Sequence, residues 1–317
     1  MKIKKREMKN NFSKITFLFT IVGTMVASSL DAQSDPSFRR NQFSALLVNP
    51  AHAGANAYDN VSVLASKSYV GFTGAPKTIA GIGNFKLFNN FGLGVSAFND
   101  QLGPINTTRA SVDFAYHLKL NSKWKMSLGL RGSSSSINID LPSLTTTQLQ
   151  DPHMQSVLSS GTSFDAGWGI LAYSKNVYVG ISQPRLMNTK FINSNVTDFV
   201  EGKSFVSYVG GDFNLNKLWS LRPVAMVRYV KSMPTMIDVS TTFSYKEMLD
   251  LGLNFQVGSN FGVIVGHEVN KKLYVGYNYT YPISSLNRIS SQSHELVLRL
   301  KLNSNSSSKF QGPRFFN

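Results

Sequence analysis

The sequence predicts an all-β protein, a transmembrane antiparallel β-barrel of about fourteen strands. Three features predict it: segments that alternate apolar and polar residues, an export signal before them, and connections that alternate between short and long. A strand places successive side chains on opposite faces, so the alternation produces one apolar and one polar face. In a membrane barrel the apolar face contacts lipid and the polar face lines the lumen.

Residues 1–32 are predicted to be a cleaved signal peptide. An apolar run, Ile15–Ala27, follows a basic stretch and is too short to span a bilayer comfortably. Small residues then lead to Ala32, after which we expect cleavage. The basic residues before the apolar run are Lys2, Lys4, Lys5, Arg6, Lys9 and Lys14.

Residues 33–60 are expected to be irregular, because Pro36, Pro50 and Gly54 interrupt any regular period. This segment precedes the first strand, so it lies in the periplasm or folds into the lumen as a plug, and both placements remain open. At the other end, residues 303–317 are polar and then aromatic and basic. They are predicted to form a periplasmic tail.

The barrel itself is predicted to occupy residues 61–302. In Ser293–Leu302 the leucines at every second position share one face, while Glu295, Arg299 and Lys301 share the other. A helix would need a period of 3.6 residues, which these segments do not show. The expected strands are residues 61–70, 77–87, 92–99, 107–119, 124–138, 163–173, 177–183, 203–214, 219–230, 236–245, 248–257, 261–268, 273–281 and 293–302.

The connections between these strands sort into two sets, as in outer-membrane barrels with short periplasmic turns and long extracellular loops. The short set is Phe88–Phe91, Leu120–Lys123, Ser174–Asn176, Leu215–Lys217, Lys246–Glu247 and Val269–Lys272. The long set includes Asn99–Asn106, Ile139–Thr162, Pro184–Gly202 and Pro282–Gln292. Glycines within the strands are expected to let the wall bend or to leave space in the lumen.

Composition narrows the classes of function. The 317 residues carry a net charge of +15, and there is no cysteine. An exported chain without disulfides needs another source of stability, which a closed hydrogen-bonded barrel supplies. We expect no nucleic-acid partner for an exported protein. The basic residues fit either attraction to anionic lipid at the outer membrane or solvation of turns and rims.

No motif indicates catalysis, so the protein is predicted not to be an enzyme. The five histidines are scattered without the spacing of a metal pair, and there is no G-x-S-x-G sequence. The glycine-rich stretches Gly71–Gly83 and Gly202–Gly211 lack the lysine of a phosphate-binding loop. We expect no cofactor and no metal.

Charged residues on the polar faces have two interpretations that remain open. They form salt-bridge networks that fill a narrow barrel, or they bind a segment inserted into the lumen. A lone buried charge is costly, so pairing is expected in either case. The candidate lumen charges are Asp113, Arg131, Asp165, Asp212, Arg222, Arg228, Asp238, Asp250, Arg299 and Lys301.

Four motifs, in three stretches of the sequence, make the chain resemble the PorP/SprF family. Asp35–Gly54 (DPSFRRNQFSALLVNPAHAG) resembles the family's Asp-Pro-x-Phe start and Asn-Pro-Ala-x-x-Gly box. Gly74–Thr78 is similar to its G-x-P-x-T element, and Gly92–Gly103 to its GLG…ND…G element. His52 departs from the pattern, because an aromatic residue such as Tyr is common there. The motif residues are Asn49, Pro50, Ala51, Gly54, Gly74, Pro76, Thr78, Asn99, Asp100 and Gly103.

The resemblance implies an outer-membrane barrel of the type IX secretion system of Bacteroidota. Such a barrel supports secretion or surface anchoring of a specific cargo, such as a gliding adhesin. The implied partners are a secreted cargo protein with a C-terminal sorting domain and, further, motor or ring components of the system.

Alternatives remain open for both function and motif. Two other functions compete with the secretion or anchoring of cargo. One is a transport barrel for small hydrophobic or polar solutes, and the other is a structural barrel bound to the gliding motor. The Asn-Pro-Ala box forms a fixed turn or contacts a partner directly, since Pro50 restricts Asn49 and Gly54 permits positive φ. The loops Ile139–Thr162 and Pro184–Gly202 are the expected surface for cargo.

Overall fold

The structure, a computed structural model, describes residues 45–88, 90–140, 158–187, 189–193, 196–201, 203–230, 233–283 and 292–302. The predicted signal peptide and the predicted tail lie outside these residues. Within the described ranges, no helix is long and apolar enough to cross a membrane.

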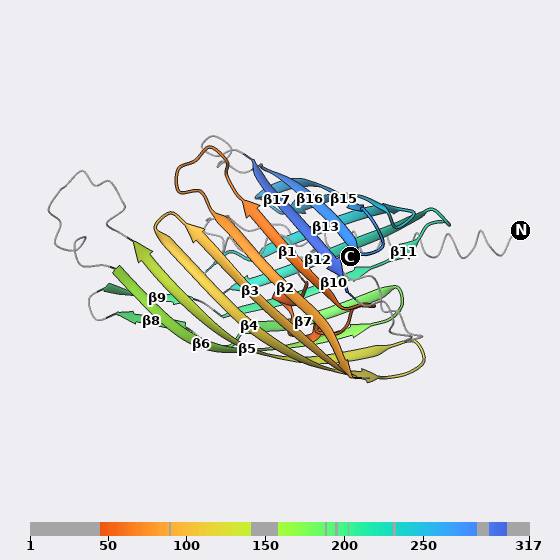
Figure 1. Cartoon of the computed structure of the whole chain (residues 1–317), viewed down its shortest axis with the longest axis horizontal. Coiled ribbons are helices and arrows are strands. Elements are labelled where there is room, and N and C mark those ends of the chain that lie inside the picture. The colour runs from red at the N-terminus through yellow and green to blue at the C-terminus, as the bar shows by residue number, and fades with distance from the viewer. Residues whose placement is uncertain are drawn as a thin grey trace, which may run out of the picture. The chain divides into compact units, whose positions relative to one another are not determined.

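Fourteen antiparallel strands form a wall that closes on itself, which confirms the predicted fold class. Each strand from β1 to β7, and from β12 to β17, pairs with its neighbour in sequence (Figure 1). The wall strands are β1 (Asn60–Lys67), β2 (Lys77–Phe88), β3 (Phe91–Leu102), β4 (Ile105–Lys119), β5 (Lys125–Asp140), β6 (Leu158–Tyr173), β7 (Val177–Arg185), β10 (Ser204–Gly211), β12 (Trp219–Val230), β13 (Met236–Tyr245), β14 (Leu249–Gln256), β15 (Asn260–Glu268), β16 (Leu273–Pro282) and β17 (Ser293–Lys301).

Two pairings complete the ring. The first strand, β1, pairs with the last, β17, from Asn60 opposite Lys301 to Lys67 opposite His294. Strand β10 pairs with β7 on one side and with β12 on the other. A ring of this kind leaves no long sheet edge with unpaired backbone groups, which a bilayer would not tolerate.

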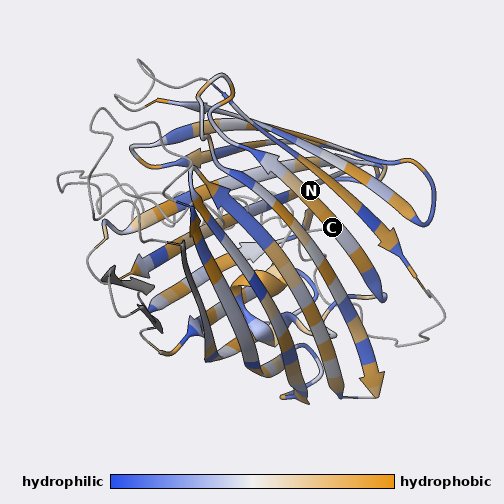
Figure 2. Ribbon diagram, turned by 60° about the vertical axis from the view of Figure 1, so that its left-hand side comes forward, coloured by the Kyte–Doolittle hydropathy of each residue, from blue (hydrophilic) through white to orange (hydrophobic). Residues whose placement is uncertain are grey.

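The wall carries its large apolar side chains on the outside. In β17, Leu296, Leu298 and Leu300 are 45%, 41% and 45% exposed, whereas Glu295 and Arg299 are each 4% exposed. Figure 2 shows the same alternation of apolar and polar residues along many of the strands. An apolar outer face over a polar interior is the arrangement of a barrel surrounded by lipid.

Connections differ between the two ends of the barrel. The turns after β2, β4, β6, β13 and β15 are short, whereas the strand ends joined by the longest connections, residues 141–157, 186–203 and 283–292, are all at the other end of the barrel. We take the end with the long connections as extracellular. The segment before β1 is then joined to the barrel at the periplasmic end.

Two of the predicted long loops are wrong in extent. The loop predicted at Asn99–Asn106 is a tight turn at Gly103 and Pro104, because β3 and β4 continue toward it. Asn and Asp are disfavoured in strands, but Asn99 Nδ2 donates across the strand pair to Asn106 Oδ1 at 2.6 Å. The loop predicted at Pro184–Gly202 contains the end of β7 and a separate hairpin of β8 (Thr189–Asn193) and β9 (Val196–Glu201).

The strand predicted at residues 203–214 is also divided. It consists of β10 and a short strand, β11 (Phe213–Asn214), which both pair with β12. Asp212 lies between them, and its backbone N–H donates to Asn176 O at 2.8 Å in the neighbouring turn. Asp212 thus interrupts the backbone pairing with β12 where the chain approaches the periplasmic turn.

Candidate functional site

Residues Ala45–Ala55 form a compact segment inside the lumen, which we call the plug. It contains one turn of helix, α2 (Ala45–Val48), and a 3-10 turn, η2 (Pro50–His52). Every residue from Leu46 to Ala53 is buried, and Figure 2 shows the helical part enclosed by strands. Of the two placements left open by the sequence, residues 45–55 adopt the one within the barrel.

Asn49 connects the plug to three strands. Its Oδ1 caps η2 by accepting from the Ala51 backbone N–H at 2.8 Å. Its Nδ2 lies within hydrogen-bond distance of Ile170 O in β6, Ile181 O in β7 and the Tyr208 hydroxyl in β10, at 3.2, 3.4 and 2.9 Å. The first residue of the Asn-Pro-Ala box is therefore a buried hydrogen-bonding hub.

Polar groups after Asn49 continue these contacts. His52 Nε2 lies 2.5 Å from the Tyr208 hydroxyl, and the two rings are stacked. His117 Nε2, in β4, donates to Ala53 O at 2.7 Å. The Asn84 side chain in β2 donates to His52 O at 3.0 Å and accepts from Gly54 N at 2.6 Å. The plug backbone is thus paired with wall side chains instead of water.

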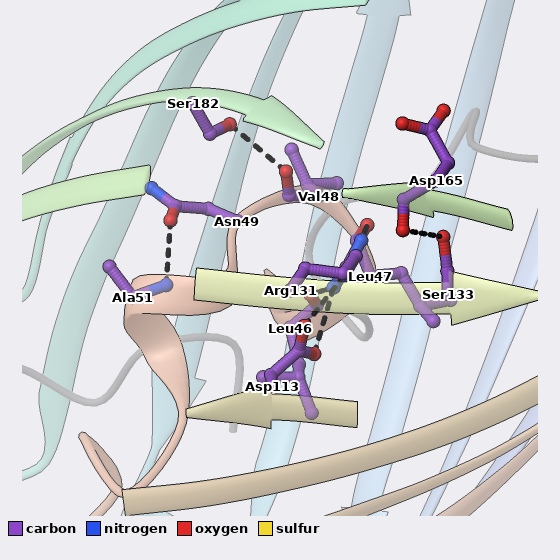
Figure 3. A network of polar contacts seen from close by, with 10 residues as sticks. All are labelled: Leu46, Leu47, Val48, Asn49, Ala51, Asp113, Arg131, Ser133, Asp165 and Ser182. Carbon is purple, nitrogen blue, oxygen red and sulfur yellow. Dashed lines mark hydrogen bonds and ion pairs between the residues drawn. The ribbon is translucent and has the colours of Figure 1, made fainter. Parts of the chain in front are cut away.

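The end of α2 is held by a buried ion pair. Arg131 in β5 binds Asp113 in β4 through two hydrogen bonds, at 2.6 and 2.9 Å. Its Nη1 donates to Leu47 O at 2.7 Å, and its Nη2, which also binds Asp113, donates to Leu46 O at 2.5 Å (Figure 3). Ser182 Oγ in β7 donates to Val48 O at 2.9 Å. A guanidinium is suited to this position, because it satisfies a carboxylate and free helix carbonyls together.

Glycines in the wall make room for the plug. A Cβ added at Gly92 in β3 would overlap Ala53 O, and one at Gly129 in β5 would overlap Ala51 N. A Cβ at Gly169 in β6 would overlap Asn49 Oδ1. At Gly129 and Gly169, where mid-strand glycines predicted bending or space in the lumen, the plug occupies that space.

Apolar contacts from the plug reach both halves of the wall. Leu46, Leu47 and Ala53 belong to a buried cluster with residues of β1–β4 and β15–β17. Val48, Ala51 and Ala55 belong to a second cluster with residues of β6, β7, β10 and β12. Burial of these side chains adds a hydrophobic contribution to the polar anchoring.

Burial also determines the charge of His52. Its imidazole lies in the plug, away from water, and this desolvation lowers its pKa from 6.5 to about 3. The nearby His117 lowers the pKa of His52 further. The plug therefore contains a neutral histidine at physiological pH.

The other two family motifs meet at the extracellular rim. Thr78 at the start of β2 donates through Oγ1 to Asp100 Oδ1 in β3 at 2.5 Å. The Gly103 N–H donates to Gly74 O at 2.9 Å, and both glycines have positive φ. Pro76 O accepts from the Ser68 N–H at 2.9 Å across the β1–β2 connection. The motif residues thus form two separate structures, the plug and this rim joint.

The ten candidate lumen charges all lie on inward faces, but they bind different partners. Asp113 and Arg131 hold the plug, whereas Arg222 lies 3.9 Å from Asp212 and 3.5 Å from Asp250 within the wall. The Asp165 carboxylate accepts from backbone N–H groups after β7, and Lys301 pairs with Glu268. Those that are buried are Asp113, Arg131, Asp165, Arg222, Arg228, Asp250 and Arg299, and those of intermediate exposure are Asp212, Asp238 and Lys301.

Several residues of the site were missed by sequence reasoning. Arg109 and Arg185 are buried charges that were not predicted. Arg109 lies four residues before Asp113 in β4, so strand parity was a signal that could have found it. Tyr208, the partner of both Asn49 and His52, lies 159 residues after Asn49, and no local pattern marks it.

The fold and the site define a class: a membrane β-barrel with a segment of its own chain bound in the lumen. A family profile described as "Type IX secretion system membrane protein PorP/SprF" matches residues 30–300. The chain belongs to the PorP/SprF family, and it is an outer-membrane component of the type IX secretion system. Among curated proteins, no sequence relative was found.

Solved structures with a similar fold are barrels of low sequence identity. The P. putida toluene transporter TodX is 11% identical, with 82% of this chain and 94% of that chain covered and a TM-score of 0.46. A Pseudomonas aeruginosa FadL homologue is 10% identical, with 82% and 94% covered and a TM-score of 0.45. The KdgM porin is 10% identical, with 77% and 99% covered and a TM-score of 0.39.

Proposed function

We propose that this barrel supports secretion or cell-surface anchoring of a specific cargo protein that carries a C-terminal sorting domain. The observation that carries the proposal, beside family membership, is the anchored plug. Six wall strands, β2, β4, β5, β6, β7 and β10, give it hydrogen bonds. A lumen filled in this way suits a rigid scaffold that presents loops at its extracellular end.

The plug also favours this role over the alternative of a solute-transport barrel. A solute that crosses the lumen would have to displace a segment whose polar groups are paired with the wall. Leaving such groups unpaired costs about 1–3 kcal/mol each. The proposal involves no catalytic step, and its partners are the cargo and, further, motor or ring components of the secretion system.

The extracellular rim is the part of the barrel that we assign to cargo. The Thr78–Asp100 hydrogen bond and the Gly74–Gly103 contact join the β1–β2 connection to the β3–β4 turn. This joint gives the rim a fixed shape. Loops held on a rigid barrel are suited to recognition, because little of their order is lost on binding.

Deletion of the gene tests the proposal. Cell-surface and culture-supernatant proteins are compared by mass spectrometry between the deletion strain and the parent. We expect at least one protein with a C-terminal sorting domain to be absent from the surface or released, and the full-length gene to restore it. Unchanged surface retention of every such protein would contradict the proposal.

Two measurements on the purified protein test the alternative functions: solute flux into liposomes tests the transport barrel, and co-purification tests the structural barrel. We expect no faster flux of small hydrophobic or sugar-sized solutes through the wild-type barrel than through protein-free liposomes. Rapid flux would support the transport barrel, and co-purification of motor or ring proteins without any cargo would support the purely structural role.

A further inference from the structure

Two lysines lie opposite each other on the outer face of the wall, at its extracellular end. Lys67 is the last residue of β1 and Lys77 is the first residue of β2, and the ladder between these neighbouring strands pairs them directly (Figure 1). Both side chains are exposed. Residues at such opposite positions have Cβ atoms about 4.5–5.5 Å apart, and like charges there destabilise a sheet. An anion bound between the two ammonium groups would remove this repulsion.

The acidic residues nearest to this pair in the ladder belong to the inner face. They are Glu295 in β17 and Asp100 in β3, each one position away from the residue that is paired with a lysine. Glu295 is 4% exposed, and Asp100 accepts a hydrogen bond from Thr78, which is 7% exposed. Successive residues of a strand point to opposite faces. The wall therefore separates these carboxylates from the two ammonium groups outside it.

The lysines lie at the edge of the apolar outer band. Two residues further into the wall, Ala65 and Ile79 are paired on the same face, and Ile79 is 62% exposed. On the other side of β1, the row of Lys67 continues through His294 to Tyr279. Tyrosine is typical of membrane interfaces, and lysine extends its ammonium group from apolar surface toward water. The two ammonium groups are therefore expected at the headgroups of the outer leaflet.

Uncharged polar residues continue the outer face beside the lysines. The row of Lys77 runs through Gln101 in β3 and Asn106 in β4 to Asn138 in β5, and the row below it contains an amide and two hydroxyls. We call these six exposed residues the amide strip, and they are Asn99, Gln101, Asn106, Thr108, Ser136 and Asn138. Amides and hydroxyls both donate and accept hydrogen bonds, as the hydroxyls of a sugar do. The strip therefore suits a carbohydrate better than an acyl chain.

These neighbours define one ligand chemistry. We propose that Lys67 and Lys77 bind a phosphate of a glycolipid of the lipopolysaccharide type in the outer leaflet. Its sugars lie on the amide strip, and its acyl chains lie on the apolar wall below. Lysine binds phosphate through charge-assisted hydrogen bonds, and the extracellular position of the pair excludes phospholipids of the inner leaflet. The site depends on the orientation of the barrel and is independent of the cargo.

Lipid binding to the purified protein in detergent micelles tests this inference. The probes are diphosphorylated lipid A, the same lipid A after enzymatic removal of its phosphates, and phosphatidylglycerol, which carries a phosphate but no sugar. Native mass spectrometry over a titration measures their affinities. We expect lipid A to bind at least about tenfold more tightly than its dephosphorylated form, and at least about fivefold more tightly than phosphatidylglycerol.

Variants locate the binding. Lys67→Gln combined with Lys77→Gln is expected to weaken lipid A about tenfold, because both charge-assisted contacts are lost. Lys271→Gln combined with Lys272→Gln is the matched control, since these two lysines are also exposed but lie in the β15–β16 turn at the periplasmic end. Its affinity is expected to stay within about twofold of wild type. Heat-dependent gel mobility shows which variants have folded, and the comparison of lipids on the wild type requires no variant.

Several results would overturn the inference. Equal binding of lipid A and its dephosphorylated form would show that no phosphate is recognised, as expected for lysines that are only solvated. Phosphatidylglycerol that binds as tightly as lipid A would overturn the role of the amide strip. An equal loss in the periplasmic control would reduce the effect to general attraction between a basic protein and an anionic lipid.

Discussion

The two halves of the barrel fill the lumen in different ways. Strands β2–β7 and β10 direct glycines, backbone carbonyls and polar side chains at the plug, as at Gly129, Ile170 and Arg131. Strands β12–β17 fill their side with long side chains that bind one another. Tyr274 donates to Asp250 at 3.1 Å, and Asp250 lies 3.5 Å from Arg222.

The difference shows which half depends on the plug. The hydrogen bonds to the plug described above come from β2, β4–β7 and β10, and the contacts with β15–β17 are those of an apolar cluster. Loss of the plug would therefore leave polar groups unpaired in the first half, whereas the second half would lose mainly apolar contacts. Two matched pairs of substitutions test this asymmetry, and two further substitutions and an exchange measurement test the plug itself.

Asp113→Asn has the largest expected effect. It leaves the Arg131 guanidinium buried without its carboxylate, and removing one partner of a buried ion pair costs about 3–5 kcal/mol. Asp250→Asn in the other half is the matched control, and it should cost less because Arg222 keeps Asp212 nearby. Urea unfolding in detergent micelles measures both free energies of unfolding. Equal losses would contradict the asymmetry.

Asn49→Ala comes next. The truncation removes the η2 cap and one of the two partners of the Tyr208 hydroxyl, so we expect the free energy of unfolding to fall by about 2–4 kcal/mol. In the other half, Asn254 Nδ2 donates to Asn278 Oδ1 at 3.0 Å, and Asn254→Ala should cost about 1 kcal/mol. A larger loss for Asn254→Ala in the same unfolding assay would argue against Asn49 as the hub.

Gly129→Ala tests the space left for the plug. The new methyl group would meet the Ala51 backbone, and overpacking of this kind costs about 1–3 kcal/mol. Gly132→Ala is the control on the same strand, because a Cβ there has nothing within 4 Å. Thermal or urea unfolding should separate the two variants. Equal stability of both variants would mean that the plug moves away from the new methyl group without loss of stability.

At neutral pH the titration of His52 has the smallest effect on stability, and it becomes measurable only as the pH falls. Burial lowers the pKa of His52 to about 3 from 6.5, so the unfolded chain binds this proton first. Stability from this group is complete above pH 6.5 and falls as pH decreases toward 3, by up to about 1.4 kcal/mol per pH unit. His52→Gln should flatten that slope relative to wild type. An unchanged slope between pH 6.5 and 4 would show that His52 does not report on the plug.

Much of the wall was predictable from the sequence, because each strand's alternation is local. Ser293–Leu302 shows its two faces without reference to any other segment, and parity placed Arg131 and Asp113 on the inner face. Errors arose where a local rule failed. Asn99 and Asp100 predicted a loop by composition, yet cross-strand hydrogen bonds keep both in β3.

The site was harder to predict, because its contacts join distant parts of the chain. The Asn-Pro-Ala box was found through its family resemblance, but its position inside the lumen depends on Tyr208 and on Gly169. Arg185 was missed because Pro184 predicted the end of the strand, whereas β7 continues to Arg185. Pairing of such groups depends on closure of the ring, which no single segment encodes.

Backbone hydrogen exchange of the plug tests the central claim most directly, since it requires no substitution. The amides of Asn49, Ala51, His52, Ala53, Gly54 and Ala55 all donate within the protein, to the plug or to the wall. Mass spectrometry of peptides covering residues 45–56 should show exchange as slow as that of strands β4 and β5 at neutral pH. Exchange of the plug amides within seconds, while the amides of β4 and β5 stay protected, would contradict a plug that is stably bound to the wall.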